Sequence, residues 1–254
     1  MLHYQIKGQG PAVFLLHGFL EDGQIWGALV NKLSRQYRCI QIDFPGYGKN
    51  KQAEFPERLE ILAGALEELR QQLCLEEFNI IGHSMGVYIG LAWLNLARVS
   101  PKAFICVNGN VYQDSPERLV ERKRSISLVS RHKEGYIKMA IKGLFLPEQL
   151  KGFASDIEQL TKRALSSPKA AVIRSIEAMS IRDDHRETLG AYHGSKHIIA
   201  GTKDPLFPLS LSQLMAQQTR ANLHTYPGSH MGWLEAPELI LRVLGSERIP
   251  SASD

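Results

Sequence analysis

The chain has 254 residues, of which 44% are hydrophobic and 22% are charged, and it carries a net charge of +4. This composition is typical of a soluble globular protein with a sizeable core, and no apolar stretch approaches the roughly 20 residues that span a bilayer. The charge excess lies wholly between residues 109 and 194, where Lys and Arg are interleaved with Glu and lack an aromatic stacking pattern, so we expect a solvated helical surface and no nucleic-acid partner.

Strand-like and helix-like runs alternate along most of the chain. The expected strands are His3–Lys7, Ala12–His17, Arg38–Asp43, Phe78–Gly82, Lys102–Asn108, Lys196–Gly201 and Asn222–Tyr226. The expected helices between them are Gln24–Arg35, Pro56–Leu73, Met85–Arg98, Leu209–Gln218 and Pro237–Leu244. Several strands are continuous apolar runs, as in parallel sheets that are buried on both faces. The alternation therefore predicts an α/β fold with a doubly wound, mostly parallel sheet.

One interval breaks this alternation. From residue 109 to residue 194 the sequence has helical periodicity and no convincing buried strand, and prolines stand where helices would begin, at Pro116, Pro147 and Pro168. We predict a core of residues 1–108 and 195–254, with residues 109–194 inserted as a helical cap of three or four helices, one of them beginning at Gly135. A packing module with no role in substrate choice is the alternative. The polar residues 247–254 are expected to form a frayed tail.

The most informative motif is the segment Gly82–Gly86, which reads G-H-S-M-G and fits the pattern G-x-S-x-G. An apolar strand-like run, Phe78–Ile81, precedes it and a helix-like run, Val87–Leu94, follows it. Strand, sharp turn and helix form the context of a nucleophile elbow, where the serine hydroxyl is exposed at the tip of a strained turn. The helix N-terminus beneath it favours negative charge. Ser84 is therefore the predicted nucleophile.

A serine hydroxyl needs a base to take its proton and a third group to orient that base. Asp204 lies in the segment Gly201–Pro205, and His230 lies in the segment Gly228–Trp233. Each follows the end of an expected strand, and these ends converge on one crevice in a parallel sheet. Taken singly, they would be an Asp-Pro turn and a surface histidine. The order Ser, Asp, His predicts a triad with His230 as base and Asp204 as its orienting group.

The developing oxyanion also needs hydrogen-bond donors. The backbone N–H of Met85 supplies one, since it directly follows the nucleophile. The second is expected from Phe19, because Gly18 permits a tight turn that aims this N–H inward. His17 organises the same loop or is simply a satisfied buried histidine. We consider His17, Gly18 and Trp233 as candidate substrate-binding residues.

Nearly end to end, the chain resembles the small, cap-bearing bacterial members of the α/β-hydrolase superfamily. The motifs that carry the resemblance are His17–Phe19, Asp43–Gly48, Gly82–Gly86, Gly201–Asp204 and Gly228–His230. The resemblance implies Ser84 as nucleophile, His230 as base and then acid, and Asp204 as orienter. It also implies that residues 109–194 are the cap and that Asp43, in a D-x-P-G-x-G turn, is structural.

Individual motifs favour or disfavour particular enzyme classes within the superfamily. The loop Leu16–Leu20 followed by Trp26 resembles the menaquinone-pathway synthase that eliminates pyruvate, but Val87–Gly90 lacks the arginine that usually follows its elbow. Ser84 argues against haloalkane dehalogenases and epoxide hydrolases, which use an aspartate nucleophile. The segment Ala178–Asp184 is similar to a phrase common in esterase-like and enol-lactonase-like members.

Our first hypothesis is a serine hydrolase that cleaves a small or medium ester, lactone or thioester through an acyl-enzyme. We expect a cytoplasmic monomer or homodimer with no cofactor, no metal and no membrane partner. The three cysteines are widely spaced, neither C-x-x-C nor H-E-x-x-H occurs, and the N-terminus does not resemble a signal peptide. Because His230 must be neutral to act as base, activity should be maximal near or above neutral pH.

Two other hypotheses remain open. A carbon–carbon bond hydrolase or a menaquinone-pathway-type lyase would use the same triad on an acidic substrate, and inward-facing Arg124, Arg182 or Arg186 would favour it. A ligand-binding receptor on a hydrolase scaffold would be favoured by a missing triad member, and none is missing. Apolar residues of the cap are equally consistent with an acyl pocket and with plain core: Ile141, Leu144, Phe145 and Leu146.

Overall fold

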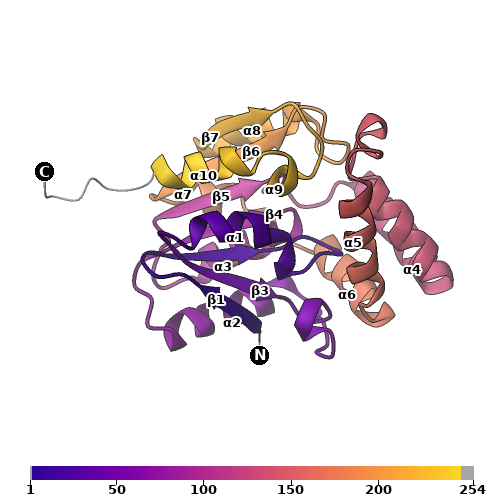
Figure 1. Ribbon diagram of the computed structural model, residues 1–254, viewed down its shortest axis with the longest axis horizontal. Helices are drawn as coiled ribbons and strands as arrows, with labels where there is room; N and C mark the ends of the chain where they lie inside the picture. Colours follow the sequence, from indigo (N-terminus) through magenta and orange to yellow (C-terminus); the bar gives the residue numbers. More distant parts are fainter. Residues whose placement is uncertain (1, 247–254) are drawn as a thin grey trace, which may run out of the picture.

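The computed structural model describes residues 2–246, which form a sheet of seven strands in the order β1-β3-β2-β4-β5-β6-β7 (Figure 1). The strands are β1 (His3–Lys7), β2 (Ala12–Leu16), β3 (Arg38–Asp43), β4 (Phe78–His83), β5 (Ala103–Val107), β6 (Ser195–Gly201) and β7 (Asn222–Tyr226). All neighbouring strands are parallel except β1, which pairs antiparallel with β3. The predicted α/β fold with a mostly parallel sheet is confirmed.

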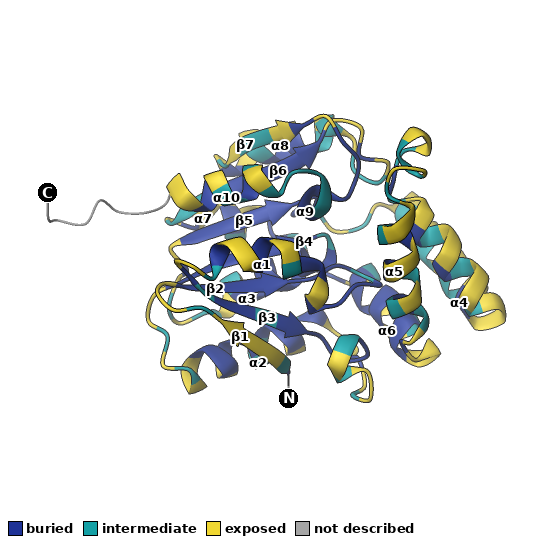
Figure 2. Cartoon of the chain, viewed as in Figure 1, coloured by how far each residue is buried: buried dark blue, intermediate teal, exposed yellow. Residues whose placement is uncertain are grey.

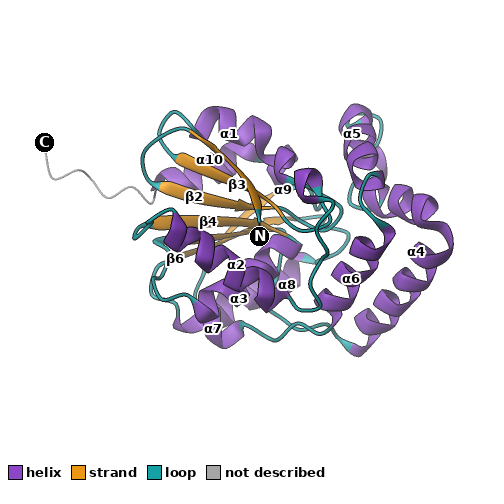
Figure 3. Cartoon of the chain, turned by 90° about the horizontal axis from the view of Figure 1, so that it is seen from below, coloured by secondary structure: helices purple, strands orange, loops and turns teal. Residues whose placement is uncertain are grey.

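Helices cover both faces of the sheet (Figure 3). One face carries α1 (Gly27–Leu33), α9 (Gly232–Glu235) and α10 (Pro237–Ser246), and the other carries α2 (Leu59–Gln72), α3 (Met85–Leu96), α7 (Arg186–Ala191) and α8 (Leu209–Thr219). Short 3₁₀ turns complete the loops: η1 (Gly23–Trp26), η2 (Gly48–Asn50) and η3 (Pro147–Gln149).

Alternation along the buried strands divides the core into two halves. In β2, Val13 and Leu15 pack towards the face of α1 and α10, whereas Phe14 and Leu16 pack towards α2 and α3. All four side chains are fully buried, as Figure 2 shows for the central strands generally. A strand that is buried on both faces must be apolar at every position, which is why its sequence lacks a polar alternation.

Between β5 and β6 the chain leaves the sheet and forms α4 (Pro116–Lys142), α5 (Ala154–Leu165), α6 (Lys169–Ser180) and α7. Helices α4, α5 and α6 lie together at one end of the molecule (Figures 1 and 3), whereas α7 returns to the sheet and packs against α3 and α8. Helix α4 consists of two helical segments joined at His132, whose φ of −143° and ψ of 63° break the helical geometry. A separate second helix was predicted, and the break before it lies three residues ahead of its predicted start at Gly135.

The predicted frayed tail, residues 247–254, lies outside the described residues. Within residues 2–246, no helix combines the length and the apolar character needed to cross a membrane.

Candidate active site

Ser84 lies at a sharp turn between β4 and α3. Its φ of 50° and ψ of −112° place a non-glycine residue in a region that L side chains rarely adopt. The flanking glycines make this turn possible: a Cβ on Gly86 would lie 2.3 Å from the carbonyl oxygen of Leu16, and one on Gly82 would lie 2.8 Å from Gly86. The strain is held by a well-packed strand and helix, as is common at functional sites.

His230 and Asp204 are brought together from the loops after β7 and β6. Nδ1 of His230 lies 2.8 Å from Oδ2 of Asp204, and both side chains are almost fully buried. Oδ1 of Asp204 accepts the backbone N–H groups of Leu206 and Phe207 at 2.8 and 3.1 Å. Burial by itself raises the pKa of Asp204, but His230 and the hydrogen bonds outweigh burial and lower it, so this carboxylate is ionised.

The other ring nitrogen of His230, Nε2, is available to accept a proton. Because Nδ1–H donates to the carboxylate, Nε2 of a neutral His230 is a proton acceptor. This Nε2 is buried and has no hydrogen-bond partner among residues 2–246. His230 and Ser84 line the same pocket. The arrangement can therefore receive a proton from a group that enters this pocket.

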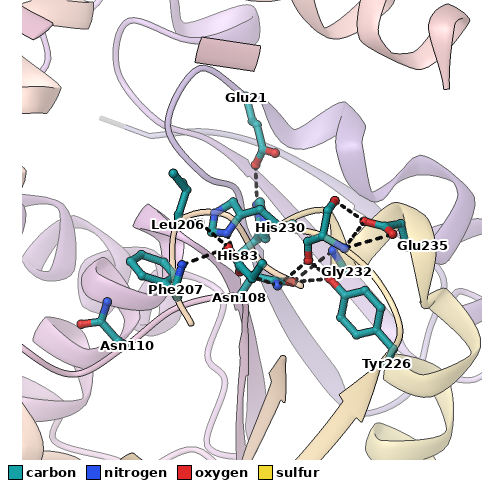
Figure 4. A network of polar contacts seen from close by, with 12 residues as sticks. Glu21, His83, Asn108, Asn110, Leu206, Phe207, Tyr226, His230, Gly232 and Glu235 are labelled. Atoms are coloured by element: carbon teal, nitrogen blue, oxygen red, sulfur yellow. Dashed lines mark hydrogen bonds and ion pairs between the residues drawn. The ribbon is translucent and has the colours of Figure 1, made fainter. Parts of the chain in front are cut away.

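Asn108, which directly follows β5, was not identified from the sequence. Its side-chain amide donates to Oδ2 of Asp204 at 2.9 Å and to the carbonyl of Ser229 at 3.1 Å (Figure 4). Its carbonyl oxygen accepts the Tyr226 hydroxyl and the N–H of Gly232, each at 3.0 Å. Asn108 thus links the two loops that carry Asp204 and His230. Its position at a strand end was the signal available in the sequence.

The loop after β2 brings Phe19 to the pocket wall but not His17 or Gly18. His17 is fully buried; its Nε2 accepts the N–H of Phe44 at 3.1 Å and its Nδ1–H donates to the carbonyl of Gly18 at 2.8 Å. This is a loop-organising role. Met85 is the first residue of α3, where backbone N–H groups have no partner within the helix.

A second pair of buried ionisable groups adjoins the nucleophile and was also missed. Glu21 Oε2 lies 2.8 Å from Nδ1 of His83, the residue before Ser84. The indole N–H of Trp233 donates to Oε1 of Glu21 at 3.1 Å, so Trp233 contacts this carboxylate and is not part of the pocket wall. Neither Glu21 nor His83 belongs to the sequence pattern of the triad, and they lie 62 positions apart.

The pocket is closed over by the helices between β5 and β6. Its wall on that side consists of Arg118, Arg122, Ala140, Leu144 and Met179. The cavity measures about 60 Å³, far less than the roughly 300 Å³ or more of sites for drug-sized ligands. In this conformation it admits only a small chemical group.

The cationic residues at the pocket differ from those that the sequence suggested. Arg124 is exposed, Arg186 pairs with Asp184, and Arg182 stacks 4.0 Å from the centroid of the Tyr88 ring, so none of them lines the wall. Of the predicted acyl-pocket residues, Leu144 lines the wall, whereas Ile141 and Phe145 are buried in the core.

Asp43 has a structural environment. Its two carboxylate oxygens accept the N–H groups of Gly23 at 2.8 Å and Lys49 at 2.9 Å. Gly46 and Gly48 have positive φ values of 83° and 55°, which lets the turn fold tightly around this carboxylate. Asp43 does not line the pocket.

Comparison with known proteins agrees with this architecture. Residues 11–126 match a family model described as alpha/beta hydrolase fold. An esterase from Thermogutta terrifontis superimposes with a TM-score of 0.87 and 25% identity, over 96% of this chain and 92% of that one. The chain has the α/β-hydrolase fold. An enol-lactonase from Burkholderia xenovorans shares this fold with a TM-score of 0.87 and 21% identity, over 97% and 95% of the two chains.

Among curated sequences, the chain is similar to a pimeloyl-[acyl-carrier protein] methyl ester esterase from Vibrio vulnificus. The two are 39% identical over 72 residues, which is 28% of this chain. The match spans 25% of the length of that esterase. The matches to other curated relatives also span less than two thirds of those proteins' lengths.

Proposed function

We propose that this protein is a serine hydrolase that cleaves a small or medium ester, lactone or thioester. The proposal rests on His230, which lines the same pocket as Ser84: its Nδ1 is held by Asp204 at 2.8 Å, and its Nε2 has no hydrogen-bond partner among the described residues. A strained serine at a helix N-terminus and an oriented, neutral imidazole are the parts that acyl transfer requires. The esterases among the similar proteins support the same reaction class.

The reaction begins when Ser84 Oγ attacks the substrate carbonyl and its proton passes to Nε2 of His230. The carbonyl oxygen becomes an oxyanion, which accepts hydrogen bonds from the N–H groups of Met85 and Phe19. Protonated His230, stabilised by Asp204, then gives its proton to the leaving alcohol or thiol. Water activated by His230 hydrolyses the acyl-enzyme and regenerates the serine.

Residues 109–194 act as the cap in this proposal, with α4 and α6 closing the pocket and α7 belonging structurally to the core side. Leu144 and Met179 supply apolar contacts to the acyl group. The cavity of about 60 Å³ takes the reacting group of a small ester, and a larger acyl group would extend along the wall made by α4 and α6. The wall they form determines which acyl groups are accepted.

A fluorophosphonate probe, which reacts only with an activated serine, tests the proposal. We expect one adduct by intact mass on the wild-type protein and none on Ser84→Ala, with both proteins folded by circular dichroism. Turnover of p-nitrophenyl acetate and butyrate should follow the same pattern. A folded wild-type protein that takes no adduct and turns over no ester would contradict the hydrolase and favour a ligand-binding receptor.

One observation favours a second candidate. Two guanidinium groups, Arg118 and Arg122, line the pocket: Arg122 pairs with Asp114 at 2.9 Å, whereas Arg118 pairs at 2.8 Å with Glu121, an exposed residue that the carboxylate of an acidic substrate could replace. The same triad would then serve carbon–carbon bond hydrolysis or a lyase step on a carboxylate-bearing compound. The test compares hydrolysis of a vinylogous 1,5-diketone acid with hydrolysis of an ester of the same acyl chain. Cleavage of the diketone alone would support the second candidate.

A further inference from the structure

The carboxylate of Glu21 accepts hydrogen bonds from three segments of the site. Oε2 accepts the N–H of Gly18 at 2.7 Å and faces Nδ1 of His83 at 2.8 Å, while Oε1 accepts the indole N–H of Trp233 at 3.1 Å. Glu21 is 4% exposed and His83 is 1% exposed. A buried carboxylate with several donors and no competing acceptor is kept ionised, because each donor favours the negative form.

The partners of His83 identify its protonation state. Nε2 lies 2.9 Å from the backbone carbonyl of His230, which can only accept, so Nε2 carries a proton. Nδ1 lies against the carboxylate of Glu21, which also accepts, so Nδ1 carries a proton as well. His83 is therefore an imidazolium that forms a buried ion pair with Glu21. Although burial opposes both charges, the mutual attraction lowers the pKa of Glu21 and raises that of His83.

The pair joins the three chain segments that the proposed reaction uses. Glu21 holds the turn at Gly18, which precedes the oxyanion donor Phe19. His83 precedes Ser84, and its Nε2–H holds the backbone of His230, whose ring centroid lies 5.2 Å from that of His83. The segments are in tight contact, since a Cβ on Gly18 would lie 2.7 Å from Glu21 Oε2 and 2.9 Å from His83 Nδ1. A change in this pair would shift donor, nucleophile and base relative to one another.

We propose that Glu21 and His83 are positioning residues, whose ion pair holds the Phe19 N–H and His230 in register with Ser84. This inference rests on the proposed serine hydrolase function. Both residues line the pocket, and the pair acts through the backbone of the oxyanion loop and of the histidine loop. Its loss should lower kcat more than it raises KM, because misplacement of about 1 Å in a catalytic site can cost about 100-fold in rate.

Glu21→Gln is the sharpest variant, since it keeps the size of the side chain. An amide cannot satisfy all three donors: if its oxygen faces Gly18 and His83, its NH₂ meets the Trp233 N–H, and if it is flipped, its NH₂ meets the Gly18 N–H. Glu67→Gln is the matched control. Glu67 is also buried, accepts the indole N–H of Trp93 at 3.0 Å and pairs with Arg70 at 2.8 Å, but it does not line the pocket.

We expect Glu21→Gln to lower kcat for p-nitrophenyl butyrate about 10- to 100-fold, with KM changed less than 3-fold. His83→Gln should give a similar loss, and the double variant Glu21→Gln/His83→Gln should lose little more than either single variant, since the two groups act as a unit. Glu67→Gln should keep kcat while losing stability. A Glu21→Gln enzyme with the kcat of Glu67→Gln would overturn the inference.

A second measurement uses the wild-type protein, so it does not depend on whether a variant folds. In ¹⁵N-histidine-labelled wild-type protein at pH 7.5, His83 should show two protonated ring nitrogens. A neutral His83 would overturn the ion pair. Failure of the proposed function looks different: the folded wild-type protein would take no fluorophosphonate adduct and turn over no ester, or Ser84→Ala would keep both, whatever Glu21→Gln does.

Discussion

The side-chain amide of Asn108 donates to Oδ2 of Asp204 over 2.9 Å, the same oxygen that Nδ1 of His230 faces at 2.8 Å. One carboxylate oxygen is thus fixed from two sides, while the other accepts two backbone N–H groups. Asn108 itself has a positive φ of 45°, a conformation that asparagine tolerates better than most residues. The backbone at the end of β5 therefore sets the plane of the carboxylate that orients the proposed base.

Removal of this amide should impair catalysis more than it impairs the fold. We expect Asn108→Ala to lower kcat about 10- to 100-fold, because Asp204 and the Ser229 carbonyl each lose a donor and the His230 loop loses its link to β5. The matched control is Asn79→Ala, which removes a buried amide that donates to the Ala12 carbonyl at 3.2 Å, at the opposite end of the sheet. Steady-state kinetics should separate the two variants. Equal kcat values would contradict the role of Asn108.

Asp204→Asn tests the orienting carboxylate directly. The amide that replaces it can present NH₂ to Nδ1, which favours the tautomer of His230 that carries its proton on Nε2 and cannot accept one from Ser84. We expect kcat to fall about 10⁴-fold, as for the corresponding change in a serine protease, with the fold retained. Fluorophosphonate labelling should slow in parallel. A variant within 10-fold of wild type would show that His230 is oriented by other groups.

The sheet, and the placement of Asp204 and His230 side by side, were predictable because both depend on local sequence patterns. The continuous apolar runs of β2 and β5 marked buried strands, since a strand buried on both faces cannot be polar, and β1, β3 and β7 have the bounds that were expected. The structure also brings Asp204 and His230 within 2.8 Å, because parallel strands end at one edge of the sheet. Their catalytic roles stay predictions.

The partners of these residues were not predictable. Glu21 and His83 belong to no periodic pattern, and they meet only because the loop after β2 folds over the turn after β4. The choice among cap arginines failed for a different reason. Which residues of α4 face the pocket depends on the rotation of that helix against the core, and a helix that is polar on most of its surface does not specify this rotation.

Arg118, the pocket-wall arginine whose carboxylate partner Glu121 is exposed, tests whether the site recognises acidic substrates. Arg118→Gln should lower kcat/KM about 10-fold for an ester whose acyl chain ends in a carboxylate, and leave a neutral ester of equal length unchanged, since one charge-assisted hydrogen bond is lost. The control is Arg131→Gln, on the same helix but outside the pocket wall. Equal losses for both esters would mean that Arg118 contributes packing and no charge recognition.

Two glycines, Gly86 in the elbow and Gly64 in α2, predict opposite effects of the same substitution. Gly86→Ala would place a methyl group 2.3 Å from the Leu16 carbonyl oxygen, so we expect it to destabilise the protein by about 1–3 kcal/mol or to prevent folding. Gly64→Ala, within α2, meets no atom within 4 Å and should stabilise the protein by about 0.5–1 kcal/mol. Urea denaturation midpoints measure both. A stable Gly86→Ala variant would contradict the close contact of α3 with β2.

The buried pair of Glu67 and Arg70 predicts how stability depends on pH. Burial opposes ionisation of Glu67, but hydrogen bonds from Arg70, Trp93 and Gln71 outweigh it and lower its pKa from 4.5 to about 2. A carboxyl group whose pKa is lower in the folded state stabilises the fold above pH 4.5, and this contribution is lost as the pH falls towards 2. The difference in unfolding free energy between wild type and Glu67→Gln should therefore be constant from pH 5 to 7 and shrink below pH 4.5. Urea titrations at pH 3, 4, 5 and 7 measure it, and a difference that stays constant down to pH 3 would show that Glu67 does not ionise more readily in the folded protein.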